Sequence, residues 1–259
     1  MELFKKIISF KRFSFLLSQL VRRDFKVRYR GSILGILWSV LNPLLNMIII
    51  SIVFSQVFRA VDNYKMHILS GLVIFNFFSE ATNMAISSVT GNFGLITKVY
   101  FPKFILPLSK VFSSAINFLI TMGVFIILGT FMKVDVWVGY MLIPYVIVCT
   151  FVFAAGISFI VATLQVFFRD TQHIYGLLMT IWMYSTPIIY DIDIIPEWAL
   201  GVFKANPLYI FIDFLRQITL HGVVPDAMSF LNCALWAGGT FIVGAYIFVK
   251  SQNKFIYYS

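Results

Sequence analysis

The sequence predicts an all-α integral membrane protein with six transmembrane helices. Of its 259 residues, 60% are hydrophobic and 12% are charged, and a soluble domain of this length could not bury so much apolar surface. The run from Gly31 to Phe58 contains no charged side chain. It is longer than the roughly 20 helical residues that cross a hydrocarbon core about 30 Å thick. We therefore expect lipid to be the solvent around most of the chain.

Positive charge indicates which side of the membrane holds the N-terminus. Nine of the 20 lysines and arginines precede Gly31. Basic residues beside a span stay on the cytoplasmic side, so the N-terminus is expected inside. In a soluble chain the formal net charge of +9 could suggest nucleic acid. Here the excess lies next to a span, where membrane lipid is the nearer partner, and we expect no nucleic-acid binding.

Charged and polar patches divide the chain into six expected spans. Their approximate ranges are 31–58, 68–90, 109–132, 136–168, 173–190 and 230–249. Outer turns fall at Arg59 and Asp62 and at Lys133 and Asp135, and this topology places 15 lysines and arginines inside against 5 outside. The bias follows the positive-inside rule, so both termini are expected in the cytoplasm. Residues 1–259 then form one transmembrane domain, in which residues 1–30 precede a bundle at 31–259.

An amphipathic helix is expected ahead of the first span. Phe13, Leu16, Leu17, Leu20 and Val21 recur at helical spacing, whereas polar and basic residues fall toward the other face. This pattern is typical of a helix that lies in the membrane interface. The alternative is an ordinary cytoplasmic helix beside the membrane, without a mechanical role.

Small residues spaced four apart predict where helices approach closely. The pairs and triplets are Gly31 with Gly35, Ala81 with Ala85, Ala154 with Ser158 and Ala162, and Ala234 with Gly238. Because such residues keep one side of a helix flat, a neighbouring helix can come near.

Motifs for catalysis and nucleotide binding are missing. The sequence contains no GxxxxGK phosphate loop, no GxGxxG, no HExxH and no GxSxG. His67, His173 and His221 are far apart in the chain, and Cys149 and Cys233 lie in apolar runs where thiols behave as small hydrophobes. We expect no catalytic residue, no metal site, no disulfide and no cofactor in this chain. Energy for any transport must come from a partner or a gradient.

Four segments, in order along the chain, resemble one family of membrane proteins. They are Arg28-Tyr29-Arg30-Gly31-Ser32-Ile33-Leu34-Gly35-Ile36-Leu37-Trp38 with Leu41-Asn42-Pro43; Leu95-Ile96-Thr97-Lys98-Val99-Tyr100-Phe101-Pro102 with Leu106-Pro107-Leu108; Phe168-Arg169-Asp170-Thr171; and Thr186-Pro187-Ile188-Ile189-Tyr190 through Asn206-Pro207-Leu208 to Phe214-Leu215-Arg216. Together they are similar to ABC-2 permeases that export polysaccharides. Each segment is weak alone, but the ordered set covers nearly the whole chain.

The resemblance implies partners and a cargo. It implies a homodimer of six-span subunits in the bacterial cytoplasmic membrane, bound to two ATP-binding-cassette subunits that hold ATP and Mg. The implied cargo is a lipid-linked polysaccharide, with O-antigen on undecaprenyl diphosphate as the leading case. In the family a coupling helix in the first cytoplasmic loop docks into the ATPase. Carried over to this chain, the coupling residues are Asn92, Leu95, Ile96, Lys98, Val99, Phe101 and Pro102.

The translocation path and the outer gate can also be assigned residues. Aromatic faces suit sugar rings, so we expect Trp38, Trp182 and Tyr184 along the path, with helix packing as the alternative for each. Glu80 is the one carboxylate well inside a span. It is expected to line a wet path or pair with Lys110, although a plain structural hydrogen bond is an equal alternative.

The exit of the fifth span is expected to form short re-entrant helices, as in the family's gate. Irregular backbone at that depth is tolerated only where protein covers it or where it lines a cavity. The expected gate residues are Pro187, Tyr190, Asp191, Pro196 and Trp198.

Other functions stay open at this point. Within the same class the chain could export teichoic acid, capsule or a hydrophobic drug. A membrane-embedded glycan-processing enzyme would need acidic residues near one interface, and only Asp191, Asp193 and Glu197 come close.

Overall fold

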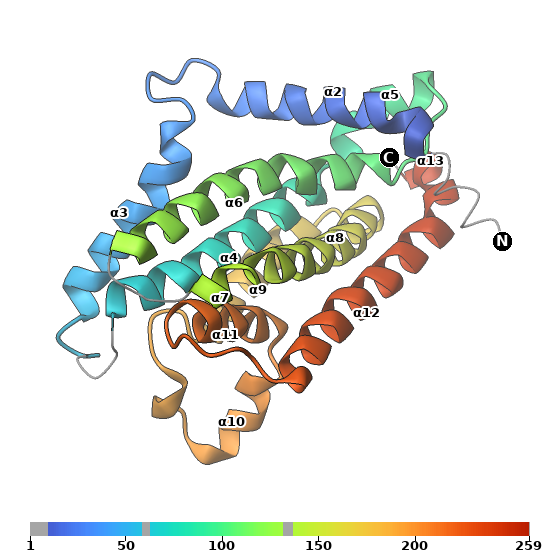
Figure 1. Cartoon of the computed structure of the whole chain (residues 1–259). Helices are drawn as coiled ribbons and strands as arrows, with labels where there is room; N and C mark the ends of the chain where they lie inside the picture. Colours follow the sequence, from blue (N-terminus) through green and yellow to red (C-terminus); the bar gives the residue numbers. More distant parts are fainter. Residues whose placement is uncertain (1–9, 59–62, 132–136, 259) are drawn as a thin grey trace.

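In a computed structural model, which describes residues 10–58, 63–131 and 137–258, every regular element is a helix (Figure 1). The elements are α2 (Phe10–Tyr29), α3 (Leu37–Phe54), α4 (Tyr64–Ile86), η1 (Thr90–Asn92), α5 (Phe93–Lys98), α6 (Ile105–Phe131), α7 (Trp137–Tyr140), α8 (Ile143–Phe167), α9 (Thr171–Tyr184), η2 (Ile192–Ile194), α10 (Glu197–Lys204), α11 (Pro207–Thr219), α12 (Ala227–Ser251), η3 (Gln252–Lys254) and α13 (Phe255–Tyr258). The all-α prediction is confirmed. The expected outer-turn residues Arg59, Asp62, Lys133 and Asp135 lie outside the described ranges.

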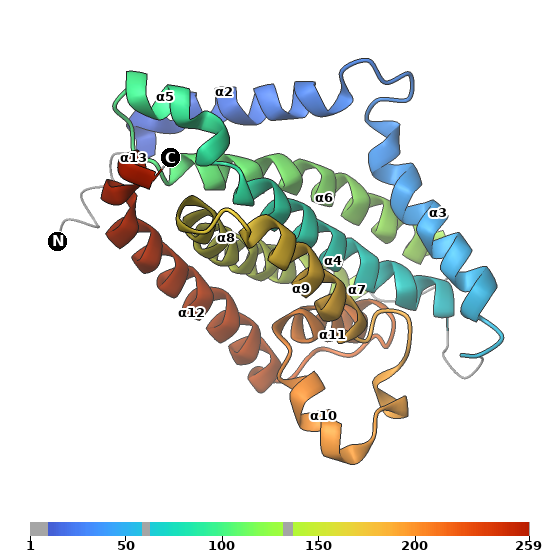
Figure 2. The ribbon, with the colours of Figure 1, turned by 180° about the vertical axis from the view of Figure 1, so that it is seen from behind.

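Helix α4 forms the centre of the bundle. It lies between α6 and α8, while α9 runs beside it on the face seen in Figure 2. Most of its side chains are buried, from Met66 near its start to Ile86 at its end. Helices α3, α9 and α11 also pack against it. Of its polar side chains, His67, Ser70 and Thr82 are buried by protein, whereas Asn76 and Asn83 are exposed.

Within the residues that the structure describes, four helices are long and apolar enough to cross a membrane. They are α3, α6, α8 and the continuous helical stretch Ala227–Lys254, with mean hydropathies from 1.5 to 2.4. Helix α4 has 23 residues, but His67, Asn76 and Glu80 make it more polar than these four. Helix α9 has 14 residues, about 21 Å of helix, which is shorter than the hydrocarbon core. The protein is thus a multi-span helical bundle, and the count of six spans stays a prediction.

Several predicted boundaries are wrong for local reasons. The first span begins at Leu37 and not at Gly31, because Gly31 and Gly35 adopt φ angles of 78° and 49°, where a right-handed helix cannot continue. The single fourth span divides into α7 and α8, with Pro144 at the start of α8. Helix α9 ends at Tyr184, six residues before the expected end, ahead of Pro187.

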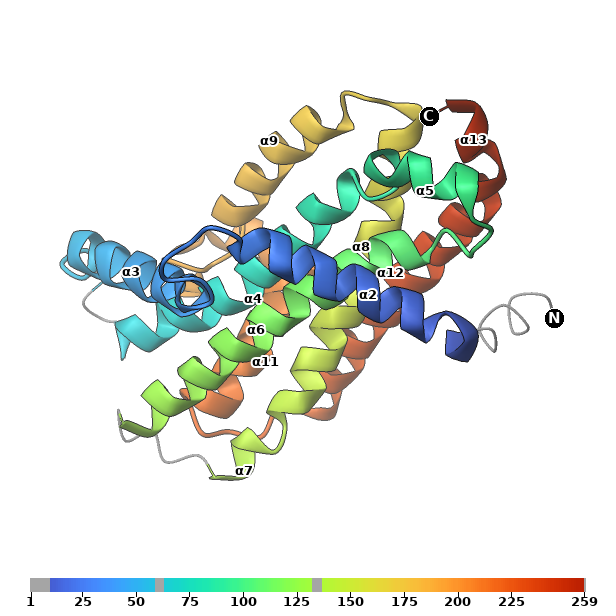
Figure 3. The same ribbon diagram turned by 90° about the horizontal axis from the view of Figure 1, so that it is seen from above.

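Helix α2 lies across one end of the bundle, as Figure 3 shows from above. Its predicted apolar face is real: Leu17 and Leu20 are buried in a cluster with Ile96, Phe159 and other apolar side chains. That face therefore packs on the protein's own helices instead of on lipid. Helices α5 and α13 lie at the same end, opposite α10 and α11 (Figure 1).

The closest helix contact joins α8 to α12. A Cβ atom placed on Gly244 would lie 2.1 Å from the carbonyl oxygen of Gly156, so the two backbones touch there. The predicted stripes at Ala81 with Ala85 and along α8 are fully buried. The predicted small-residue positions Gly31, Gly35 and Gly238 have nothing within 4 Å of an added Cβ atom. Helix α12 therefore packs through Gly244 and not through the predicted Gly238.

Candidate functional site

A polar cavity of about 640 Å³ lies between the end of α2 and helices α3, α4 and α6. Most of its wall consists of hydroxyl, amide and charged side chains. The lining residues are Arg28, Tyr29, Ser32, Trp38, Ser39, Asn42, Pro43, Asn46, Val73, Asn76, Phe77, Ser79, Glu80, Ser114, Asn117, Phe118 and Thr121. Two of the four residues predicted for the path, Trp38 and Glu80, belong to this wall.

Glu80 is paired with Arg28 from α2. One Nη atom of Arg28 contacts the Glu80 carboxylate, and the other donates to the sulfur of Met84 at 2.8 Å. Asn117 Nδ2 donates to the same carboxylate at 3.2 Å. A carboxylate inside a span is costly unless it is paired, and the arginine supplies the opposite charge. Pairing of Glu80 with Lys110 is wrong, because the Lys110 ammonium bonds to Asp24 at 2.7 Å.

The sequence interpretation missed Arg28, although a signal for it exists. Arg28 follows Leu17, Leu20 and Asp24 at helical spacing, so it shares the buried face of α2. A buried cation requires an anion nearby, and Glu80 is the one carboxylate in the middle of an expected span. The two residues could therefore have been paired from the sequence.

Hydrogen bonds fix the polar groups of the cavity wall. The Tyr29 hydroxyl donates to Asn117 Oδ1 at 2.8 Å and also contacts the Ser39 hydroxyl. Thr121 Oγ1 donates to the Ser39 carbonyl at 3.2 Å. These bonds tie α2, α3 and α6 together around the cavity, so its shape is set by the fold.

The other two predicted path residues lie elsewhere. Trp182 packs against Phe78 and Phe153, and its indole N–H donates to Asn206 Oδ1 at 2.9 Å. This is the helix-packing arrangement that was the alternative for it. Tyr184 is 66% exposed at the end of α9. The fold therefore brings Trp38 and Glu80 together and leaves Trp182 and Tyr184 apart from them.

The predicted coupling residues divide into buried and exposed groups. Ile96 and Phe101 are buried, and Leu95 packs partly against the same apolar cluster as α2. Lys98 and Val99 face outward, and Pro102 is half-buried. Tyr100, which the prediction left out, is 97% exposed. A docking partner would therefore meet the stretch 98–100, while the other residues hold α5 on the bundle.

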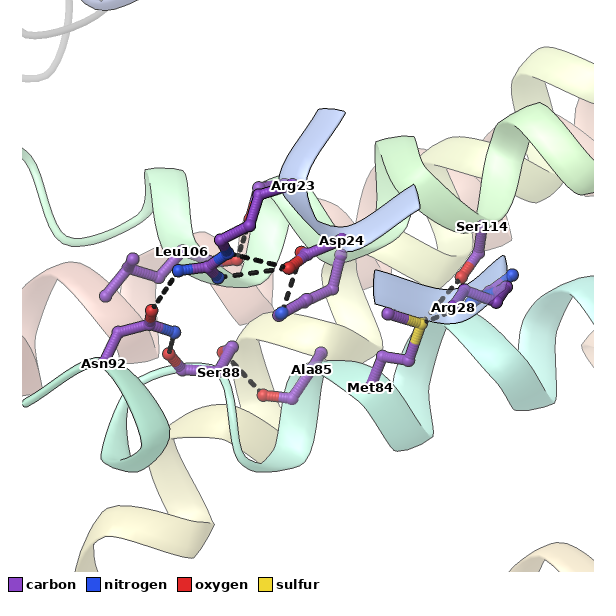
Figure 4. A network of polar contacts seen from close by, with 11 residues as sticks. Arg23, Asp24, Arg28, Met84, Ala85, Ser88, Asn92, Leu106 and Ser114 are labelled. Carbon is purple, nitrogen blue, oxygen red and sulfur yellow. Dashed lines mark hydrogen bonds and ion pairs between the residues drawn. The ribbon is translucent and has the colours of Figure 1, made fainter. Parts of the chain in front are cut away.

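Asn92 belongs to a polar network that joins three elements (Figure 4). Arg23 donates to Asn92 Oδ1 at 3.1 Å and to Asp24 Oδ1 at 3.1 Å. The Asp24 carboxylate, whose side chain is 7% exposed, also accepts from Lys110 Nζ at 2.7 Å. Helix α2 is thus fastened to α6 and to the start of the coupling segment by charged groups.

The predicted gate residues lie along the chain that follows α9. Pro187 is buried, Tyr190 and Asp191 are half-buried, and Pro196 and Trp198 are exposed at α10. The Tyr190 hydroxyl donates to the Tyr184 carbonyl at 2.6 Å. After them α11 turns back into the bundle, where Phe211, Phe214 and Leu215 are fully buried. The expected short helices are present.

Within the described residues, no group of three or more His, Cys, Asp or Glu side chains could hold a metal ion. Cys149 and Cys233 are buried free thiols.

Residues 16–220 match the ABC-2 type transporter family. The chain belongs to that family. The matched range contains the cavity, α5 and the segment after α9. The resemblance inferred from the four sequence segments is confirmed.

Curated relatives of this ABC-2 family member carry transport names. The chain is 33% identical to the O-antigen export system permease protein RfbA of Myxococcus xanthus, over 87% of this chain and 90% of that protein. It is 32% identical to the Klebsiella pneumoniae protein of the same name, over 93% of each chain. The polysialic acid transport protein KpsM of Escherichia coli is 21% identical, over 90% of this chain and 92% of that protein.

Proposed function

We propose that this chain is the membrane subunit of an ATP-driven exporter that moves a lipid-linked polysaccharide, O-antigen on undecaprenyl diphosphate, out of the bacterial cytoplasm. Relatives whose names state O-antigen export match nearly its full length at 32–33% identity. The relative named for polysialic acid is more distant, at 21%. This difference supports O-antigen over capsule.

The chemistry of the cavity wall is the structural observation that carries the proposal. Asn42, Asn46 and Asn76 line it, and an amide side chain has both donors and an acceptor, which suits the hydroxyl groups of sugars. Trp38 adds an aromatic face. Pockets for drug-sized ligands are lined mainly by hydrophobic side chains with few polar groups. The cavity wall carries more polar side chains than such pockets do, because 12 of its 17 lining residues bear a hydroxyl, amide or charged group, and this favours a glycan over a hydrophobic drug.

The partners are part of the proposal. Because the sequence lacks a phosphate loop, two separate ATP-binding-cassette subunits supply hydrolysis, and they dock at Lys98, Val99 and Tyr100. Helices α3 and α9 both expose large apolar side chains: Ile52 on α3 is 72% exposed and Leu177 on α9 is 70% exposed. Apolar surfaces of this kind are covered by lipid or by a second copy of the chain. We propose a homodimer with both termini in the cytoplasm.

Labelling of single cysteines tests the orientation. Cysteine at Asp193 is expected to react with an impermeant thiol reagent added outside intact cells, whereas cysteine at Thr97 or Asn253 is not. Both native cysteines are buried, so they give little background. Reaction at Thr97 from outside would reverse the topology.

Deletion of the gene in its own host tests the function. We expect surface polysaccharide to be lost and lipid-linked polymer to accumulate on the inner leaflet, with recovery when the chain is supplied again together with its ATPase. Unchanged surface polysaccharide, combined with new sensitivity to a hydrophobic toxin, would replace the proposal with drug export. Loss of capsule alone would replace O-antigen with capsule.

A further inference from the structure

The backbone that follows α9 is bound by side chains at three consecutive carbonyl groups. Arg216 Nη2 donates to the Ile188 oxygen at 3.3 Å, and the Tyr64 hydroxyl donates to the Ile189 oxygen at 2.8 Å. His67 Nε2 lies 3.4 Å from the Tyr190 carbonyl oxygen. Because a carbonyl oxygen can only accept, the imidazole nitrogen is the donor in this contact. Tyr64 and His67 belong to α4, and Arg216 belongs to α11. We call these three side chains the carbonyl cradle.

A notch in α4 holds the same segment sterically. A Cβ atom on Gly71 would lie 2.8 Å from Ile188 Cγ2 and 3.2 Å from Ile188 Cα. The Ile188 side chain is fully buried against this notch. Glycine at position 71 is therefore required for the segment to lie as close to α4 as it does.

Burial of the charged Arg216 side chain makes this contact energetically costly. The residue is 4% exposed, and its other hydrogen bonds go to Ser70 Oγ and the His67 carbonyl, both at 3.2 Å. Among the residues that the structure describes, no carboxylate lies within ion-pair distance of it. Burying a cation on neutral acceptors is unfavourable unless a specific arrangement is gained. The arrangement gained here is the attachment of residues 188–190 to α4.

We infer that Tyr64, His67 and Arg216 are positioning residues that make the outer gate move with α4. The inference rests on the proposed export function, which gives the segment after α9 its role as a gate. Helix α4 starts at the cradle, carries Glu80 in the cavity wall, and leads through η1 into the coupling segment α5. A displacement of α5 by the ATPase can therefore reach residues 188–190 through η1 and α4.

Hydrogen–deuterium exchange on the assembled transporter in lipid nanodiscs tests the attachment. Tyr64→Phe removes one oxygen atom, and Gly71→Ala fills the notch, so both should loosen the segment by different routes. We expect amide exchange in residues 188–195 to rise roughly two- to tenfold, as for the loss of one net hydrogen bond. Arg216 is too buried to replace safely, so it is not the primary variant.

Matched controls are available in the same chain. Tyr246→Phe removes a hydroxyl from a residue that is 60% exposed on α12, and Gly123→Ala adds a methyl group where nothing lies within 4 Å. Neither should alter exchange in residues 188–195. If Tyr64→Phe and Gly71→Ala also leave it unaltered, the cradle does not hold the segment and the inference is overturned.

A second measurement separates gate positioning from a purely structural role. In a background with Asp193→Cys, the rate of reaction with an impermeant maleimide is measured with and without vanadate-trapped nucleotide on the ATPase. We expect nucleotide to change this rate when the cradle is intact and to have no effect on it in Tyr64→Phe. An unaltered nucleotide response in Tyr64→Phe would overturn the inference. Neither measurement uses a glycan, so an error in the proposed cargo leaves both results valid.

Discussion

Replacing Gly244 with alanine should separate α12 from α8. The added methyl carbon would lie 2.1 Å from the Gly156 carbonyl oxygen and 2.9 Å from its carbonyl carbon. Carbon and oxygen atoms in contact are ordinarily about 3.3 Å apart or more. The obstructing atoms are backbone, which cannot rotate away as a side chain can. The two helices must therefore move apart by about 1 Å, along the most extensive helix contact in the bundle.

The expected loss of stability follows from two opposing effects. Overpacking of a close contact costs typically 1–3 kcal/mol, and a rigid backbone obstacle places Gly244→Ala at about 3 kcal/mol. Alanine favours helix over glycine by about 1 kcal/mol, which offsets part of this cost. The net loss is about 2 kcal/mol, or roughly a 30-fold fall in the ratio of folded to unfolded protein.

The native cysteines provide the assay. Cys149 lies in α8 and Cys233 in α12, both are buried, and they are the only two cysteines in the chain. A thiol-reactive fluorophore added during heating therefore reports opening of this helix pair. Gly239→Ala is the control, because it adds the same methyl group on the same helix where nothing lies within 4 Å. Equal midpoints for Gly244→Ala and Gly239→Ala would refute the reasoning.

Three further perturbations test other parts of the structure. Asp24→Ala leaves Lys110 without its partner at 2.7 Å, and the free energy of unfolding should fall by roughly 3 kcal/mol. Exchanging the two residues should restore part of this stability. No loss of stability in Asp24→Ala would show that the pair is dispensable. Tyr100→Asp, at a residue 97% exposed, should reduce co-purification of the ATPase while the melting midpoint stays the same, and undiminished co-purification would remove Tyr100 from the docking surface. Trp38→Ala should lower polysaccharide flux while the protein stays at normal abundance, because about 1 kcal/mol of stacking on the sugar is lost. Trp182→Ala should instead lower the abundance of the protein, because this side chain packs inside the bundle. The opposite pattern would make Trp182 the path residue and Trp38 the packing residue.

The site shows where sequence reasoning succeeds and where it stops. Trp38 could be proposed from sequence because aromatic faces suit sugar rings, and Glu80 because a carboxylate inside a span is unusual. The partner of Glu80 was missed, because Arg28 precedes it by 52 positions and reaches it only when α2 folds back across the bundle. Trp182 looked equally suited to the path, yet its indole N–H is used by Asn206.

The coupling segment shows a similar division. Its position between two expected spans followed from hydropathy and charge, whereas its coupling role comes only from the family resemblance. Which of its side chains face outward did not follow, because Ile96 and Phe101 are as apolar as Val99 and Tyr100. The apolar cluster to which α2, α6, α8, α12 and α13 contribute decides the matter by burying the first two.

The sequence by itself determined the helical membrane class, the approximate helix order, and the irregular segment around Pro187 and Pro196. These properties depend on local features, namely apolar runs of sufficient length, charges between them, and glycine or proline at the breaks. Tertiary structure alone decided the Arg28 and Glu80 pair, the backbone contact at Gly244, and the carbonyl cradle formed by Tyr64, His67 and Arg216. Each of these joins residues far apart in the chain, and the pairing depends on helix rotation and crossing geometry, which no local pattern encodes.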